Sequence, residues 1–137
     1  MQDEIFPVCV PEIADRLTKH SDLAFETLLS DETWIDDWSI WASSVGGDIF
    51  LNSSGPVFSL FGLALQEAIN GAGVLIGHGF LVEEYVRRGE LVAPFSDRCN
   101  IDQSLYIRFN EQNFDDPVVH EIVKALQESC LSLVAPQ

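Results

Sequence analysis

Three histidines and three cysteines are the side chains of this sequence most suited to chemistry. A Ser/His/Asp or Cys/His catalytic set needs a nucleophile beside a base, and a Gly-x-Ser-x-Gly nucleophile elbow is one clear signal of such a set. The sequence contains no such elbow, and His20, His78 and His120 stand in unrelated contexts. We therefore expect no catalytic residues and predict that the chain is not an enzyme.

Paired acidic residues also suggest chemistry, but they fit helix starts or solvated faces better than acid and base catalysis. No calcium-loop spacing is present, so we expect no metal. A dinucleotide loop lies after a strand and before a helix, whereas Gly71-Ala-Gly73 follows a predicted helix, so we expect no cofactor. The acidic pairs are Asp31-Glu32, Asp36-Asp37, Glu83-Glu84 and Asp115-Asp116.

Two positions have a residue type and a place suited to binding. Ser59 stands where a predicted strand ends and a helix begins, so its hydroxyl and the free backbone N–H groups could hold an anion. The alternative is that Ser59 only caps the helix. His78 follows an apolar strand, at the carboxyl edge where open α/β sheets bind ligands. The alternative is that this histidine between glycines is only a turn residue.

Composition excludes several partners. The 22 acidic residues against 7 basic ones give a formal net charge of −15, so DNA and anionic lipid surfaces should repel the chain. No apolar run approaches the roughly 18 residues of a membrane span, and the acidic N-terminal residues do not resemble a secretory signal. The three cysteines fit no disulfide framework or zinc site, so we expect a reducing cytoplasm and cysteines that are small apolar residues.

Apolar periodicity predicts alternating strands and helices, most clearly between residues 61 and 95. A helix stopped by Asn70-Gly71 is followed by an apolar strand over 73–77 and by a helix over 80–89 that Gly89 ends. Such alternation is typical of an α/β layer with a mostly parallel sheet. The other predicted elements are strands at 4–10, 27–29, 57–60, 91–95 and 104–109, short helices from Pro11 and at 21–22, a helix over 37–45 ended by Gly46-Gly47, loops at 48–55 and 96–103, and a helix from Asp116-Pro117.

The run from Phe61 to Phe95 resembles the effector-binding domain of LysR-type transcriptional regulators. It has the family's helix with a Leu-Gln-Glu-Ala core, then Gly-x-Gly-Val, an apolar strand, a helix that ends in Gly-x-Leu-Val, and Pro-Phe. The opening Phe-Pro-Val-Cys-Val-Pro at 6–11 and the tryptophans Trp38 and Trp41 after Asp37 are similar to the branch of glycine-cleavage activators.

This resemblance implies an incomplete two-lobed domain of the periplasmic-binding-protein type (type II). Residues 1–103 would form the second lobe, with a mostly parallel sheet flanked by helices. Residues 104–137 would form a strand and a helix that return to the first lobe in the family. The opening half of the first lobe and the family's winged helix-turn-helix have no counterpart in the printed residues.

The resemblance also implies a function: an effector-sensing and oligomerising module that binds a small anionic ligand in an inter-lobe cleft and thereby controls transcription. The expected ligand-binding residues are Cys9, Val10, Ser59, Leu60, Phe61 and His78. The expected partners are the effector and further copies of the chain, with DNA reached only through a winged helix-turn-helix. One alternative is an assembly domain of the same fold that senses nothing. A remoter one is a solute-binding protein, disfavoured because no export signal is seen.

Overall fold

A computed structural model describes residues 2–46, 55–104, 106–108, 110, 112 and 115–134, with the backbone alone for 130–134. The loop predicted over 48–55 lies outside these residues except for Gly55.

The described residues form one sheet in the order β3-β2-β4-β1-β5. Strand β2 pairs in parallel with β3 and with β4, whereas β1 is antiparallel to both β4 and β5. Four strands therefore run one way and β1 runs the other way, which confirms the predicted α/β lobe with a mostly parallel sheet. The strands are β1 Gln2–Val8, β2 Leu28–Asp31, β3 Val57–Phe58, β4 Val74–His78 and β5 Cys99–Ser104.

The helices begin and end largely where the sequence predicts. Gly46, Gly71 and Gly89 follow three of them with φ values of 71°, 83° and 76°, a backbone conformation that favours glycine. The helices are α1 Pro11–Ala14, the 3-10 helix η1 His20–Phe25, α2 Asp37–Val45, α3 Phe61–Ile69, α4 Gly79–Arg87 and α5 Pro117–Val134.

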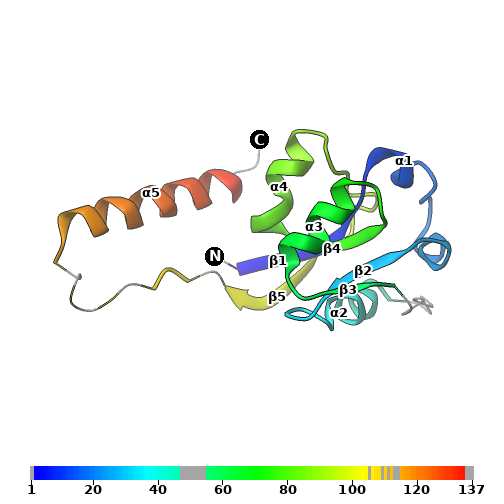
Figure 1. Ribbon diagram of the computed structural model, residues 1–137, viewed down its shortest axis with the longest axis horizontal. Helices are drawn as coiled ribbons and strands as arrows, with labels where there is room; N and C mark the ends of the chain where they lie inside the picture. The colour runs from blue at the N-terminus through cyan, green and yellow to red at the C-terminus, as the bar shows by residue number, and fades with distance from the viewer. Residues whose placement is uncertain are drawn as a thin grey trace.

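Two apolar clusters cover the two faces of the sheet, because successive residues of a strand point to opposite faces. Ile5 belongs to a cluster with residues of α1 and α2, and its neighbour Phe6 belongs to a cluster with residues of α3 and α4. Helices α1 and α2 thus pack on one face, and α3 and α4 on the other (Figure 1). The sheet is therefore covered by one layer of helices on each face.

Three predictions between residues 91 and 109 are wrong. The stretch 91–95 is not a strand, since Val92 forms only one isolated bridge, with Cys9. The stretch 96–103 is not a loop, because it contains most of β5, which pairs with the start of β1. The strand predicted over 104–109 is also wrong: β5 ends at Ser104, and residues 106–108 have no regular structure.

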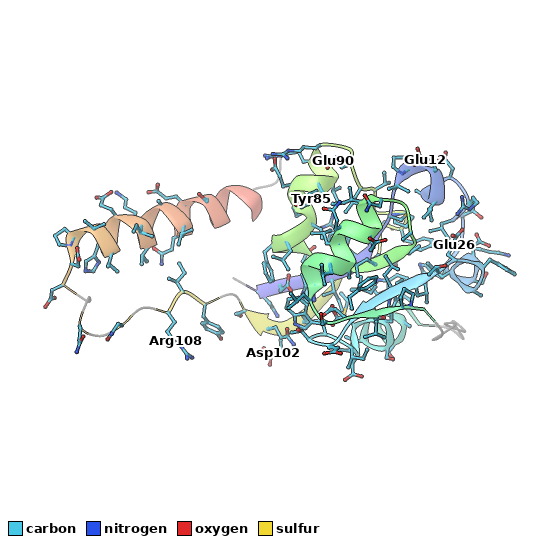
Figure 2. All side chains as sticks on the ribbon, in the orientation of Figure 1. Glu12, Glu26, Tyr85, Glu90, Asp102 and Arg108 are labelled. Carbon is cyan, nitrogen blue, oxygen red and sulfur yellow. The ribbon has the colours of Figure 1, made fainter. Side chains whose placement is uncertain are left out.

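The helix predicted from Asp116-Pro117 is confirmed as α5, which stands apart from the sheet (Figure 1). Along residues 117–129 most of its side chains are exposed, as Figure 2 shows, and Val118, Ile122 and Leu126 are 64%, 54% and 47% exposed. No helix in the described part of the chain is long and apolar enough to cross a membrane.

Candidate functional site

The candidate site lies at the edge of the sheet where β2, β3 and β4 end and β1 begins, which we call the carboxyl edge. Because these three strands are parallel, Ser59–Phe61 after β3 and His78 at the end of β4 come to the same edge. The structure thus brings together four of the predicted ligand-binding residues. The start of β1 lies at the same edge, because Ile5 of β1 pairs with His78.

Cys9 and Val10 do not join them. Val8 pairs with Leu75 near the start of β4, so these two residues lie at the opposite end of β1 from His78. The Cys9 side chain is fully buried in the core, and burial raises the pKa of its thiol to about 12. Val10 is half-buried at the N-terminus of α1. Because β1 is antiparallel to β4, it carries both residues away from that edge, and their contact with a ligand stays a prediction.

His78 is fully buried and bonded at both ring nitrogens. Its Nδ1 pairs with an Oδ2 oxygen of Asp3 at the start of β1, and its Nε2 lies 2.8 Å from Oδ2 of Asp37 at the start of α2. A carboxylate only accepts hydrogen bonds, so both nitrogens donate, as the imidazolium does. We call these three residues the histidine cluster. It joins β1, α2 and the β4–α4 junction.

The pKa of His78 follows from two opposed effects. Burial lowers it, because the charged form loses water, but the hydrogen bonds and charges of Asp3 and Asp37 raise it to about 9. The two carboxylates therefore outweigh burial, and the ring is charged at neutral pH. The second oxygen of Asp3, Oδ1, is buried and has no hydrogen-bond partner among the described residues.

Aromatic rings enclose the histidine cluster on its outer side. The ring centroid of Trp34 lies 3.9 Å from that of His78, and those of Phe61 and Phe80 lie at 5.7 and 5.9 Å. Trp34 also meets Phe61 edge-on at 5.3 Å. We call these three rings the aromatic wall; all three are half-buried, so a ligand at the carboxyl edge can reach them.

A turn holds Trp34 in this wall. Oδ1 of Asp31, at the end of β2, accepts the backbone N–H of Thr33 at 2.9 Å and that of Trp34 at 3.1 Å. Asp31 is buried, and an aspartate that hydrogen-bonds the backbone two residues later is the usual way to stabilise such a turn. The position of Trp34 therefore depends on the end of the neighbouring strand.

The N-terminus of α3 lies open beside the aromatic wall. Leu60 is its N-cap, and no side chain caps it, so the alternative that Ser59 caps this helix is wrong. Ser59, Leu60 and Gly62 are exposed, and a Cβ added at Gly62 would meet nothing within 4 Å. The first N–H groups of a helix carry partial positive charge and bind anions. This end of α3 can thus accept a carboxylate or a similar group.

The sequence did not identify Asp3, Asp37 or Trp34 as part of a site. Asp3 and Asp37 are 75 and 41 residues from His78, and Asp37 was assigned to a helix start, which it is. Nothing in the local pattern signals that two distant carboxylates meet one imidazole. The register of β1 against β4 brings Asp3 to His78, and the position of α2 brings Asp37 to it.

The described side chains hold no group of three or more His, Cys, Asp and Glu residues arranged for a metal ion. The histidine cluster is almost closed to solvent, since His78 has no exposed surface and Asp3 and Asp37 are 3% and 6% exposed. The part of this edge that can bind something is the rim: the aromatic wall and the start of α3.

Comparisons with known proteins point to one family. The chain is 41% identical over 106 residues to the HTH-type transcriptional regulator DsdC of Escherichia coli K12, covering 71% of this chain and 34% of that protein. It is 33% identical over 106 residues to the glycine cleavage system transcriptional activator of the same organism, covering 75% of this chain and 34% of the activator. The chain thus spans about a third of the length of these relatives. No protein-family profile matches it.

Solved structures share the fold. The effector domain of the regulator AmpR of Pseudomonas aeruginosa matches with a TM-score of 0.70 at 20% identity, over 96% of this chain and 62% of that one. An effector-binding domain from Citrobacter freundii with three substitutions matches with a TM-score of 0.76 at 22% identity, over 93% and 64%. The chain therefore belongs to the LysR-type transcriptional regulators and corresponds to part of their effector-binding domain.

Proposed function

We propose that this chain senses a small anionic effector at the carboxyl edge and thereby controls transcription as part of a longer regulator. The observation that carries the proposal is the open N-terminus of α3 next to the aromatic wall, with Ser59, Leu60 and Phe61 on its rim. Backbone N–H groups would hold the acidic group, and the rings of Phe61 and Trp34 would pack on the rest of the ligand.

The net charge of −15 does not argue against an anionic effector. Charges separated by more than about 8 Å of salt solution are largely screened, whereas a ligand at a helix end is in direct contact with its donors. The local groups therefore decide. His78 adds no attraction for an anion, because the two negative charges of Asp3 and Asp37 exceed its single positive charge.

The carboxyl edge would form one wall of a cleft, with a second lobe providing the other. Residues 104–137 would connect to that lobe, and residues 1–103 would form the lobe described above. An effector can control transcription only if it binds one arrangement of the lobes better than another. We place the regulator in the cytoplasm as a homo-oligomer that meets DNA through a winged helix-turn-helix outside these residues.

A thermal-shift screen of amino acids and aromatic acids on this chain tests the proposal. An effector at 100 times its Kd should stabilise the fold by about 2.7 kcal/mol. Ser59→Ala and Phe61→Ala should each reduce that shift. Ser21→Ala is the matched control, since Ser21 is an exposed serine of η1, the segment that leads to Glu26 (Figure 2). A screen without hits, or hits that both variants leave unchanged, would contradict the proposal.

One observation favours a second function, assembly without sensing. Val118, Ile122 and Leu126 form an exposed apolar stripe on α5, and exposed apolar patches drive association. If the stripe mediates self-association, Ile122→Glu should lower the sedimentation coefficient at high protein concentration. Gln127→Glu, an exposed change on the same helix, should not. Equal behaviour of the two variants would remove this alternative.

A further inference from the structure

The histidine cluster lies between the aromatic wall and the paired ends of β1 and β5. Strand β1 begins at Gln2 and β5 ends at Ser104, and these two residues pair with each other. Beyond Ser104 the chain leaves the sheet toward α5 (Figure 1). The connection from the sheet to α5 therefore starts opposite Gln2, the residue before Asp3.

The backbone at Asp3 is irregular. The register of β1 against β5 shifts between Gln2 and Asp3, as at a β-bulge, and bulged strands bend locally. The side chain of this same residue makes the bond to His78, and its Oδ1 lies 3.9 Å from the position that a Cβ on Gly79, the first residue of α4, would occupy. The irregularity of β1 beside the end of β5 thus lies at the residue that bonds His78, and His78 in turn bonds Asp37 of α2 and directly precedes α4.

On its other side, His78 supports the aromatic wall. The Trp34 ring lies 3.9 Å from its ring at a tilt of 36°, and Phe61 meets it edge-on at 5.7 Å. If Trp34 moves, the packing against the imidazole of His78 changes. Because both nitrogens of that ring are hydrogen-bonded, a shift of the ring also acts on Asp3 and Asp37. Packed interiors transmit such shifts rather than absorb them.

The cluster is also poorly satisfied for a buried polar group. It contains two carboxylates and one imidazolium, and Oδ1 of Asp3 lacks a partner. Partly satisfied buried networks cost free energy, and their geometry depends on the neighbours that enclose them. A small change in those neighbours can therefore shift the bond at Asp3.

We propose that His78 is a positioning residue that connects the aromatic wall to the ends of β1 and β5, so that occupancy of the wall changes the direction in which the chain leaves the lobe. This inference rests on the proposed effector site for its biological meaning. Its physical content, coupling between Trp34 and the strand ends through Asp3 and His78, does not depend on a ligand.

Amide hydrogen exchange on the full chain tests the coupling without a ligand. Trp34→Leu should raise exchange at residues 2–5 and 101–104 by about tenfold, since local opening sets these rates. Phe95→Leu is the matched control, because Phe95 is a half-buried ring that stacks on Trp41, whereas the described ring contacts of His78 are with Trp34, Phe61 and Phe80. It should raise exchange at those amides by less than about twofold at an equal loss of global stability.

The decisive step repeats both changes in an Asp3→Asn chain. If His78 acts through Asp3, Trp34→Leu should then add less than about twofold at the strand ends. His78→Gln serves as the second background if Asp3→Asn fails to fold. The same tenfold effect in either background would overturn the inference, and so would a rise spread evenly over all amides. A thermal-shift screen without hits would contradict the effector proposal alone.

Discussion

His78 and His20 each hydrogen-bond an aspartate from a distant part of the chain, and each lies against aromatic rings. His20 bonds Asp97 at 2.9 Å and meets the rings of Trp41 and Phe95 at 5.4 and 4.8 Å. Helix α2 contributes to both sites, with Asp37 on His78 and Trp41 on His20. The residue types are almost the same, but the surroundings are not.

Burial separates the two sites. The His20 and Asp97 side chains are 28% and 42% exposed, whereas those of His78 and its two aspartates are 9% exposed or less. Water competes for the exposed pair and salt screens it, so such pairs contribute about 0–1 kcal/mol. In the buried cluster the loss of one partner leaves unpaired charges. The pairing of histidine with aspartate should therefore contribute little to the free energy of unfolding at His20, and its loss at His78 should lower that free energy strongly.

The largest expected effect is that of His78→Leu. It leaves two buried carboxylates without a donor, so the free energy of unfolding should fall by about 3–5 kcal/mol. Urea unfolding measures it. Adding Asp3→Asn and Asp37→Asn to His78→Leu removes both buried charges and should restore part of the loss. A loss below about 1 kcal/mol from His78→Leu would show that the cluster is no more important than a surface pair.

The pH dependence of stability should come next in size. The folded pKa of His78, about 9, is above the ordinary value of 6.5, so its contribution is fully present below pH 6.5 and is lost as the pH rises through 9. The free energy of unfolding should fall by about 3 kcal/mol from pH 6 to pH 9. Measurements should stop there, because above pH 9 ionisation of Cys9 in the unfolded chain adds a second loss.

The control for this pH series is His78→Gln, which keeps His20 and His120. Subtracting its pH profile from that of the unchanged chain isolates His78. Parallel profiles would mean that His78 does not carry the buried charge inferred from its two bonds.

A smaller effect is expected at the turn that holds Trp34. Asp31→Ala removes the acceptor of two backbone N–H groups and should lower the free energy of unfolding by about 1 kcal/mol, as the loss of a capping residue does. Trp34 should also become more exposed to acrylamide quenching. Asp31→Asn keeps an oxygen acceptor and should retain most of both properties. Equal effects of the two variants would mean that the charge of Asp31, rather than its acceptor, positions Trp34.

The sequence predicted the fold best where local patterns decide it. Between residues 61 and 89 the apolar periodicity and the glycines at 71 and 89 are sufficient to place α3, β4 and α4. Strand β5 was missed because only Ile101 of its residues is buried, so its sequence resembles a polar loop. The stretch 91–95 is apolar because Leu91 packs in the core, not because it pairs along a strand.

The site could be predicted only in part, because local patterns indicate where strands end but not how distant strands pair. Ser59 and His78 follow strand ends, and parallel strands bring such residues to one edge whatever the details of packing. Asp3 reaches His78 only because β1 is antiparallel to β4 in one particular register. That register depends on the whole sheet, and the opposite direction of β1 also explains why Cys9 lies at the other end of the strand from His78.

The smallest expected effect is that of His20→Gln, and it tests the comparison from the exposed side. Gln can still donate to Asp97, so the free energy of unfolding should change by less than about 1 kcal/mol. Adding about 1 M salt, which shortens the screening length to about 3 Å, should reduce even this difference. The effect of His78→Leu should persist at high salt, because ions do not reach a cluster with almost no exposed surface. If His20→Gln and His78→Leu lowered the free energy of unfolding equally at low and at high salt, burial would not be what distinguishes the two histidines.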